Sequence, residues 1–594
     1  MAQRHPAGGA WSELTYPELY TKSRAIAGGL LDLGVRPGDR VSILSRTCAE
    51  WTQADIGAML VGATLVPIFD TNSAEEVRYV LDDSGARVIF CDDPAQVEKL
   101  ARGGSAPGLE HTIVFAGEHA DAMPLAELEQ RGAGTDSERL QRARAGIGPQ
   151  DLATLVYTSG TTGPPKGCRL TQNSLAINSQ MVIDRLPLDP GNVFFTFLPL
   201  AHVLTRMVQL VALRVGGTLA YWSGDMNAIL DDLAVVKPTH LPSVPRVFEK
   251  GYANAQNTAA AGGPVKQALF QAATGVGLRA ASLRRQGKPL PPALKLAHAA
   301  ADRVVLSRVR EVFGGRVQLA VCGGAPIDPA ILEFFDACGI PICEGWGMTE
   351  TSAVTTLNPL QGRRFGTVGP ALPGAEVRLA DDGEVLVRGP HVFSGYEGNE
   401  HATADALRDG WLHTGDVGSL DANGYLTLTG RKKEIVVTSS GKNVSPGNVE
   451  LALIGIRGVS QAVVHGDRRP YLVALLTLDP IEAPKVAADL GIDSQDPSVI
   501  AQDERWHGHL SAAVAETNAR FAPISQVKRF TLARREFSQE AGEVTASLKI
   551  KRALVQERYG ADFERLYGHE RGSTDVWLER DRAGESQAAQ SATV

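Results

Sequence analysis

Residues 155–167 read Leu155-Val156-Tyr157-Thr158-Ser159-Gly160-Thr161-Thr162-Gly163-Pro164-Pro165-Lys166-Gly167. The apolar run 153–157 predicts a strand that leads into a loop of small residues, hydroxyls and one lysine. Small side chains let backbone N–H groups approach phosphate oxygens, and Lys166 adds a positive charge. The loop is not a Walker A loop, because Gly167 rather than Ser or Thr follows the lysine. We interpret it as a phosphate-binding loop; the alternative is a flexible Gly/Ser/Thr loop.

The composition is that of a globular protein, with 594 residues of which 43% are hydrophobic and 21% charged. A net charge of −8 argues against a basic nucleic-acid binder, so no nucleic-acid partner is expected. The six cysteines show no C-x-x-C spacing, which predicts reduced thiols and a cytoplasmic protein. Residues 1–14 lack the apolar region of a secretory signal. The longest apolar run, 56–69, is shorter than the roughly 20 residues of a membrane span.

Strand and helix patterns alternate through the first part of the chain, which favours an α/β fold. The patterns predict helices over 16–33 and 50–62 and strands over 40–44, 64–69 and 87–90. Residues 250–316 are Ala-rich and helical in pattern, and 276–316 carry nine Lys/Arg against two acids.

Farther along, short β-type runs between Gly and Asn turns over 370–430 predict a small antiparallel or barrel-like subdomain, with a hairpin at 421–425. Strands near 434–438, 462–465 and 471–478 indicate a new unit. The predicted fold class is therefore α/β. It has a large N-terminal domain of layered sheets with a small β-barrel-like subdomain (1–430) and a small α+β C-terminal domain on a hinge (431–570). The polar residues 571–594 are predicted to form a flexible tail.

Residues 155–166 resemble, at all twelve positions, the signature of the AMP-forming acyl-adenylate superfamily, which includes acyl-CoA synthetases. Six further segments resemble the family's other motifs in the same order. These segments are 197–203 (Phe-Leu-Pro-Leu-Ala-His-Val), 323–326 (Gly-Gly-Ala-Pro), 346–350 (Trp-Gly-Met-Thr-Glu), 411–416 (Trp-Leu-His-Thr-Gly-Asp), 430–434 (Gly-Arg-Lys-Lys-Glu) and 547–552 (Ser-Leu-Lys-Ile-Lys-Arg). The resemblance covers about residues 11–567, and Trp346 stands where relatives commonly have Tyr.

The resemblance implies a role for residues of each motif. ATP or AMP would be bound by Thr158, Ser159, Gly160, Thr161, Thr162, Gly163, Lys166, Gly324, Ala325, Pro326, Trp346, Gly347, Asp416 and Arg431. The implied catalytic residues are Lys549, His202, Thr349 and Glu350, with Glu350 also holding Mg²⁺ on the nucleotide. Lys433 would be the hinge pivot, and Gly441 and Lys442 would bind coenzyme A. Arg206, four residues after His202, is expected at the mouth of the acyl pocket.

Taken singly, several of these residues have ordinary structural interpretations. His202 alone is more often a structural histidine, Glu350 a solvated carboxylate, Asp416 a turn residue and Lys549 a residue on the polar face of a strand. The order and spacing of the motifs favour the functional interpretation.

Residues 241–250, the helical insertion after them and the ending 544–552 resemble long-chain fatty-acid–CoA ligases. The predicted reaction joins a fatty acid to coenzyme A with ATP and Mg²⁺, through an acyl-AMP intermediate. The alternatives are a ligase for another hydrophobic carboxylate, a fatty acyl-AMP ligase serving a carrier, and a catalytically silent nucleotide-binding relative. The partners are small-molecule substrates. The basic stretch 276–316 has two interpretations, peripheral contact with the inner membrane face or an ordinary solvated basic helix face.

Overall fold

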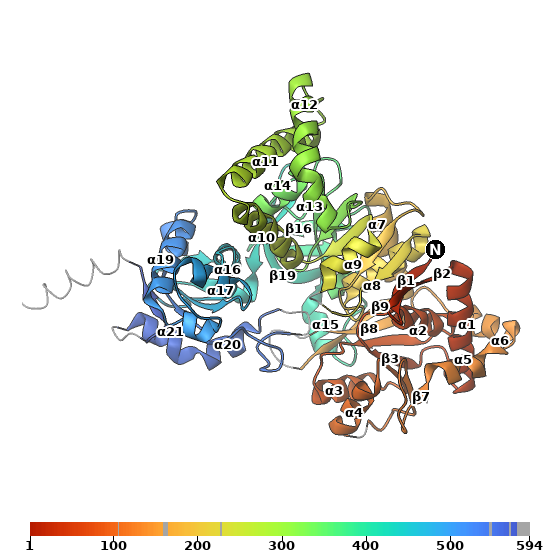
Figure 1. The fold of residues 1–594 in the computed structure, drawn as a ribbon. Helices are drawn as coiled ribbons and strands as arrows, with labels where there is room; N and C mark the ends of the chain where they lie inside the picture. Colours follow the sequence, from red (N-terminus) through yellow and green to blue (C-terminus); the bar gives the residue numbers. More distant parts are fainter. Residues whose placement is uncertain (105, 159–163, 226–227, 546–548, 569–571, 579–594) are drawn as a thin grey trace, which may run out of the picture. The chain divides into compact units, whose positions relative to one another are not determined.

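A computed structural model describes residues 1–104, 106–158, 164–225, 228–545, 549–568 and 572–578 (Figure 1). The chain divides into two compact units. Unit 1 comprises Met1–Ala380, Val385–Thr414 and Leu420–Thr427, and unit 2 comprises Asp381–Glu384, Gly415–Ser419 and Leu428–Val594. The structure is mixed α/β with several sheets, as the sequence predicts.

Unit 1 contains two large sheets, both mostly parallel. The eight-stranded sheet runs in the order β15 (Thr356–Leu357), β14 (Ile342–Trp346), β13 (Leu319–Cys322), β12 (His240–Ser243), β10 (Val193–Thr196), β11 (Thr218–Tyr221), β1 (Gln3–Ala7) and β2 (Ala10–Leu14). The seven-stranded sheet runs β7 (Met123–Pro124), β6 (His111–Val114), β5 (Val88–Cys91), β3 (Arg40–Leu44), β4 (Thr64–Ile68), β8 (Leu152–Thr158) and β9 (Lys166–Thr171). These strands are continuous apolar runs because parallel strands are covered on both faces of the sheet.

Helices separate and cover these sheets, so that unit 1 is layered. Between the sheets lie α1 (Tyr16–Asp32), α2 (Ala49–Leu60) and α8 (Val203–Val215), whose apolar side chains share one core with both sheets. The far face of the seven-stranded sheet packs against α3 (Ala74–Ser84) and α4 (Pro94–Gly103). The far face of the eight-stranded sheet packs against α9 (Ile229–Val236), α10 (Pro245–Ala261), α11 (Pro264–Arg285), α13 (Ser307–Val312) and α14 (Pro329–Ala337).

The early sequence patterns are confirmed closely. The helix predicted over 16–33 is α1, and a capping box between Thr15 and Glu18 fixes its beginning. The strand predicted over 40–44 is β3, and those over 64–69 and 87–90 correspond to β4 and β5. These elements have strong local signals: a cap for the helix, and short apolar runs ended by turn residues for the strands.

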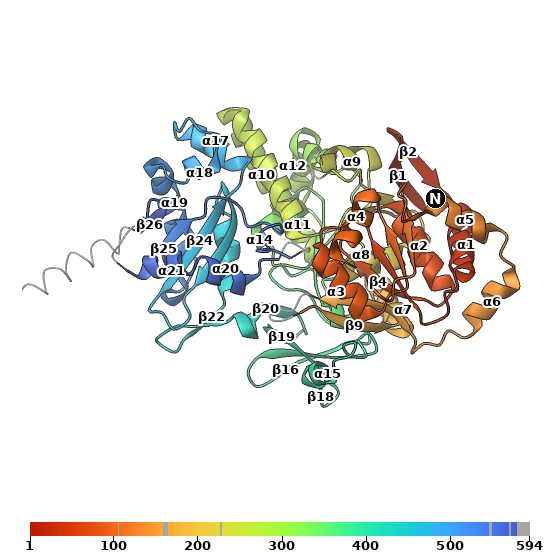
Figure 2. The ribbon, with the colours of Figure 1, turned by 90° about the horizontal axis from the view of Figure 1, so that it is seen from below.

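The predicted helical stretch 250–316 is formed by α10, α11, α12 (Pro292–Ala301), a π-helical turn at Asp302–Leu306 and α13 (Figure 2). The helix α12 contains no buried residue, and Leu296 on it is 76% exposed. The remaining helices of unit 1 are α5 (Leu125–Ala133), α6 (Ser137–Ala145), α7 (Gln172–Arg185) and α15 (Glu400–Ala406).

A five-stranded sheet lies where the sequence predicts a small β subdomain. Its order is β16 (Glu376–Leu379), β17 (Glu384–Arg388), β19 (Trp411–Leu420) and β18 (Leu407–Arg408), with β20 (Leu426–Arg431) paired to β19. The predicted hairpin is present, because the Asp421 N–H donates to the Tyr425 carbonyl over 3.1 Å.

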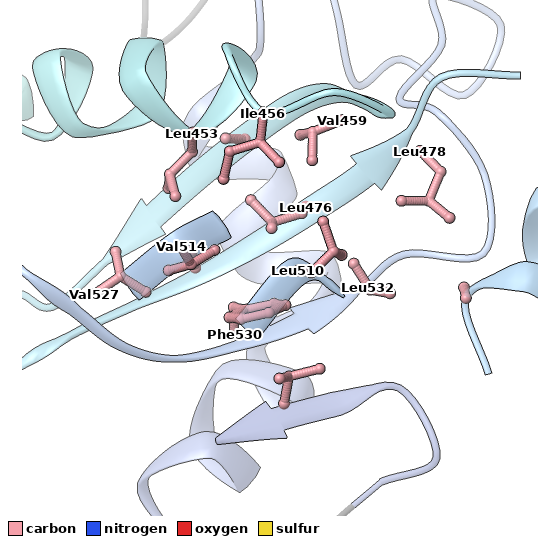
Figure 3. Close-up of a cluster of buried hydrophobic side chains, with 14 of the residues drawn as sticks. Leu453, Ile456, Val459, Leu476, Leu478, Leu510, Val514, Val527, Phe530 and Leu532 are labelled. Atoms are coloured by element: carbon pink, nitrogen blue, oxygen red, sulfur yellow. The ribbon is translucent and has the colours of Figure 1, made fainter. Parts of the chain in front are cut away.

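Unit 2 is built on a four-stranded sheet of order β23 (Val459–His465), β24 (Leu472–Leu478), β25 (Val527–Leu532) and β26 (Asp575–Trp577). Its helices are α16 (Pro446–Ile454), α17 (Glu482–Asp489), α18 (Pro497–Ile500), α19 (Glu504–Asn518), α20 (Arg552–Arg558) and α21 (Gly560–Tyr567). Figure 3 shows how Leu453, Leu476, Leu510 and Phe530 fill the core between sheet and helices.

The beginning of the predicted tail, at residue 571, is wrong. Residues 575–577 form β26, which pairs antiparallel with β25. The Asp575 side chain is fully buried and forms an ion pair with Arg565 over 2.8 Å. This tertiary contact could not be predicted from the polar composition of the segment. Residues 579–594 lie outside the described part of the chain.

All six cysteines are free thiols, as the sequence predicts, and all belong to unit 1. Burial raises the pKa of each of them, which keeps the thiols protonated and unreactive. Among the described residues, no helix is both long enough and apolar enough to span a bilayer.

Candidate active site

Four of the predicted motifs lie at the carboxyl ends of strands of unit 1. Segment 197–203 follows β10 and Gly324 follows β13, while Trp346 is the last residue of β14 and Thr158 is the last residue of β8. Because β10, β13 and β14 belong to one parallel run, their carboxyl ends lie at the same edge of the sheet. This edge is where open α/β sheets bind ligands.

The predicted phosphate loop is the connection between β8 and β9. Thr158 and Lys166 face each other in register across these antiparallel strands. They therefore mark the two ends of the loop, and the Pro165 carbonyl accepts a 2.9 Å hydrogen bond from Tyr79. Ser159, Gly160, Thr161, Thr162 and Gly163 lie outside the described residues.

Tyr396, which the sequence analysis did not identify, connects Glu350 with Lys166. The Tyr396 hydroxyl donates to Glu350 Oε1 over 2.7 Å, and the Lys166 ammonium lies 5.2 Å from the centre of the Tyr396 ring. The carboxylate of Glu350 is almost fully buried, since that residue is 7% exposed. A lysine, a phenol and a carboxylate from three segments of unit 1 thus converge on one place.

The surroundings of Tyr396 and of the neighbouring Cys168 keep both side chains protonated. Burial and the nearby Glu350 charge raise the pKa of Tyr396, so the phenol remains a hydrogen-bond donor. The same two causes raise the pKa of the neighbouring Cys168, which remains a thiol. The Tyr396 hydroxyl thus binds Oε1 of Glu350.

The Tyr396 segment is fastened to β9. Cys168 and Tyr396 form an antiparallel bridge, and the Arg169 N–H donates to the Gly395 carbonyl over 3.0 Å. The next residue, Glu397, accepts from Arg169 at 2.9 Å and from Arg40 at 3.0 Å. A single sequence carries no signal for this arrangement, because residues 168 and 396 meet only through the tertiary fold.

The backbone after β14 is tightly constrained. A Cβ on Gly347 would lie 1.9 Å from the Ala353 carbonyl oxygen, so only glycine fits there. Ser352 and Ala353 adopt left-handed φ values of 55° and 114°, a conformation that non-glycine residues adopt at an energetic cost. Thr349 and Glu350 lie in the short helical turn between these points and are both buried. Such strain is typical of functional sites.

The predicted adenine-side residues differ in exposure. Trp346 is buried at the end of β14, whereas Gly324, Ala325 and Pro326 are exposed in the loop between β13 and α14. The two motifs are adjacent, because a Cβ on Gly323 would lie 3.3 Å from the Gly345 carbonyl.

His202 caps the N-terminus of α8, where its Nδ1 accepts from the Leu204 N–H over 3.2 Å. The bond fixes the imidazole where α8 begins, next to the end of β10. A small, mostly apolar cavity adjoins this segment. It is lined in part by Phe195, Phe197, Leu198, Leu204, Val208 and Pro242.

The expectation that Arg206 lies at the pocket mouth is wrong. Arg206 is 2% exposed, and its guanidinium pairs with the fully buried Asp55 over 2.7 Å. Gln209 also donates to Asp55, over 2.7 Å. Arg206 lies one helical turn after His202, and its side chain points into the core between the sheets. A charged residue in such a core needs a buried partner.

In unit 2, the two residues predicted to bind ribose meet. Arg431 Nε lies 3.0 Å from Asp416 Oδ1, with Asp416 buried and Arg431 about half exposed. Lys433, the predicted pivot, is exposed in the turn Lys432–Glu434.

The predicted coenzyme A residues occupy the turn of a small hairpin of β21 (Val436–Val437) and β22 (Asn443–Val444). Gly441 takes a φ of 75° there, and Lys442 is exposed. The strand predicted near 434–438 is thus shorter than expected, because Lys432–Glu434 form a helical turn.

Lys549 is exposed on a loop of unit 2. Its backbone N–H donates to Thr545 Oγ1 over 3.1 Å, and its carbonyl accepts from the Thr545 N–H over 2.8 Å. Residues 546–548 lie outside the described part of the chain.

Comparison with known proteins identifies the family. Residues 2–397 match the AMP-binding enzyme family, and residues 433–571 match the AMP-binding enzyme C-terminal domain. The chain is an AMP-binding enzyme. It is 40% identical over 573 residues to long-chain-fatty-acid–CoA ligase FadD15 of Mycobacterium tuberculosis, covering 95% of this chain and 93% of that protein. It is 31% identical to the peroxisomal long chain acyl-CoA synthetase 7 of Arabidopsis thaliana, covering 96% and 83%.

Solved structures share the fold of this AMP-binding enzyme. The anthranilate CoA ligase AuaEII in complex with anthranoyl-AMP has a TM-score of 0.71 at 21% identity, covering 95% of both chains. The A domain of carboxylic acid reductase from Segniliparus rugosus, in complex with AMP and a co-purified carboxylic acid, has a TM-score of 0.73 at 21% identity, covering 95% and 91%.

Another buried carboxyl of the AMP-binding enzyme, Glu344, lies two residues before Trp346. Burial raises the pKa of Glu344 to about 8, opposed by a hydrogen bond from the Gly366 backbone. Its Oε2 is buried without a hydrogen-bond partner, consistent with a neutral carboxyl.

This pKa predicts a stability that falls with rising pH. The unfolded chain loses the Glu344 proton near pH 4.5, whereas the folded chain holds it until about pH 8, so the free energy of unfolding decreases between these values. Glu344→Gln should flatten that slope and raise the unfolding free energy above pH 8 by a few kcal/mol. Urea unfolding at several pH values measures it, with the exposed Glu333→Gln as control. Equal slopes for Glu344→Gln and the parent would contradict the prediction.

Proposed function

We propose that this chain is a long-chain fatty-acid–CoA ligase that converts ATP, a fatty acid and coenzyme A into acyl-CoA, AMP and pyrophosphate. The observation that carries the proposal is 40% identity, over 95% of the chain, to a protein named as a long-chain-fatty-acid–CoA ligase. The geometry of unit 1 supports it, because a lysine and an oriented carboxylate meet beside the connection between β8 and β9.

In the first half-reaction, a carboxylate oxygen of the fatty acid attacks the α-phosphorus of ATP, and the bond to pyrophosphate breaks. Lys166 and Thr158 bind the departing pyrophosphate, Thr349 contacts the α-phosphate, and His202 lies beside the fatty-acid carboxylate. Asp416 and Arg431 bind the ribose. Lys549 neutralises charge between the acyl oxygen and the α-phosphate, a role in which positioning and electrostatics dominate.

Magnesium fits the site, because one buried carboxylate and the phosphates of a nucleotide form a donor set that Mg²⁺ prefers. Glu350 would hold it, and Tyr396 fixes the orientation of that carboxylate through the 2.7 Å bond. Bound with ATP, the ion neutralises phosphate charge.

In the second half-reaction, the thiol of coenzyme A attacks the acyl carbon and AMP leaves. We assign the backbone of Gly441 and Lys442 to binding of the pantetheine. Lys433 is then the pivot of a rotation in which Lys549 leaves the site and the turn of Gly441 and Lys442 takes its place. The two half-reactions then use two different parts of unit 2, one after the other.

The decisive experiment measures pyrophosphate release with ATP, Mg²⁺ and carboxylic acids from short to very long chains, plus aromatic acids, with and without coenzyme A. Release that peaks with long chains, with acyl-CoA formed only when coenzyme A is present, supports the proposal. A peak with another acid points to a ligase for that acid, and acyl-AMP accumulating despite coenzyme A points to a fatty acyl-AMP ligase. Protein that binds ATP but releases no pyrophosphate is a silent relative.

We further propose that this cytoplasmic enzyme contacts anionic membranes through α11 and α12. Leu296 on α12 is 76% exposed, and Val265 and Leu269 on α11 are 81% and 48% exposed. The two helices also carry Lys266, Arg279, Arg284, Arg285 and Lys295. Apolar side chains within a cationic surface suit an anionic lipid headgroup layer.

A vesicle assay tests this contact. Binding to phosphatidylglycerol vesicles should be strong at low salt, weak at high salt and reduced by Lys295→Glu/Leu296→Ser. The matched control, Arg142→Glu/Arg144→Glu on the exposed helix α6, should bind as the parent does. Absence of salt-sensitive binding would exclude the membrane contact.

A further inference from the structure

The loop that bears Lys549 is closed at its base by backbone hydrogen bonds. Val544 and Ile550 form an antiparallel bridge, and the Lys551 N–H donates to the Glu543 carbonyl over 2.7 Å. Glu543 therefore lies where the chain enters the loop, opposite Lys551, where the chain leaves it.

The buried side chain of Glu543 pairs with two partly exposed arginines. It is 0% exposed, and its two oxygens lie 2.6 Å from Arg535 Nη1 and 2.8 Å from Arg558 Nη1. The Ser538 N–H also donates to it, over 3.2 Å. Burial opposes the charged form, but the two guanidinium groups outweigh it and hold the pKa of the carboxyl below its ordinary value.

These partners come from both sides of the loop. Arg535 precedes it in sequence, and Arg558 is the last residue of α20, which follows it. At the other end of α20, Arg552 pairs with Glu450 of α16 through two bonds of 2.6 and 2.7 Å. Glu450 in turn accepts from the Val464 N–H of β23 over 2.7 Å. The base of the loop is thereby fixed to a helix and to the central sheet of unit 2.

We propose that Glu543, held by Arg535 and Arg558, is a positioning residue for Lys549 and that it acts in the adenylation half-reaction alone. The inference rests on the proposed function, in which Lys549 serves adenylation. A carboxylate that touches no substrate can matter this way, because a displacement of about 1 Å at a reacting group lowers a rate by about 10²-fold.

The test compares Glu543→Gln with the parent in two assays: pyrophosphate release, and acyl-CoA formation from supplied acyl-AMP. Glutamine keeps the size of the side chain, and Arg535 and Arg558 are partly exposed, so water can solvate them and the fold is retained. Adenylation should fall by about 10- to 100-fold, with the thioester step unchanged. The matched control is Asp575→Asn, which removes an equally buried charge paired with Arg565 in unit 2 and should leave both steps unchanged.

A double variant separates positioning from a general structural role. If Glu543 acts through Lys549, adding Glu543→Gln to Lys549→Ala should lower adenylation no further. A further decrease, an equal loss of both half-reactions, or the same selective loss in Asp575→Asn would overturn the inference. If Lys549→Ala itself retains adenylation, the proposed function of Lys549 fails; if only Glu543→Gln retains it, this inference fails.

Discussion

Lys549→Ala is expected to lower adenylate formation by about 10²–10³-fold, the usual effect of removing one donor that meets developing charge. Conversion of supplied acyl-AMP to acyl-CoA should be unchanged, because we assign that step to the turn of Gly441 and Lys442. The side chain is exposed, so its truncation should leave the fold intact. Pyrophosphate release and thioester formation, measured separately, check both parts.

Lys551→Ala is the natural control, since it removes a lysine two residues along the same segment. It should retain both half-reactions. An equal loss of both half-reactions in folded Lys549→Ala would rule out the division of labour between the two parts of unit 2.

Glu350→Gln should have an effect of the same order, a loss of about 10²–10³-fold in adenylation. The change keeps an acceptor for the Tyr396 hydroxyl but removes the charge that we assign to magnesium. Pyrophosphate release measured against magnesium concentration should show a higher requirement for the ion. The thioester step from supplied acyl-AMP should proceed normally, because no pyrophosphate leaves in it.

Tyr396→Phe provides a graded comparison. It keeps the ring beside Lys166 and removes only the hydroxyl that orients Glu350. Groups that orient a metal ligand typically change affinity or activity by about 10–100-fold, so this variant should fall between the parent and Glu350→Gln. A normal magnesium requirement in both variants would remove Glu350 from the metal site.

The fold could be predicted from sequence where local signals are strong. The helix α1 has its cap and apolar spacing within its own residues, and β3 is a short apolar run in a predicted α/β alternation. The strand β26 could not be predicted, because its pairing with β25 and the ion pair of Asp575 with Arg565 are tertiary contacts, and polar composition alone indicates a tail.

The candidate site shows the same division. Motif resemblance predicts that Asp416 and Arg431 each bind the ribose, and in the structure Arg431 Nε lies 3.0 Å from Asp416 Oδ1. Tyr396 carries no motif signal of its own and is recognised only by its bond to Glu350. Arg206 was misplaced because helical spacing from His202 gives sequence proximity but not which side of α8 faces the core.

The distribution of the thiols makes the two units separately observable. No cysteine occurs after residue 343, so a thiol-reactive dye added to the native protein reports the transient opening of unit 1, while unit 2 unfolds without any labelling signal. A single cysteine introduced at Val499, which is 52% exposed, would react far faster than the sheltered native thiols. That site would carry a fluorophore on unit 2 alone, and the motions of this unit could then be followed during turnover without replacing any native cysteine.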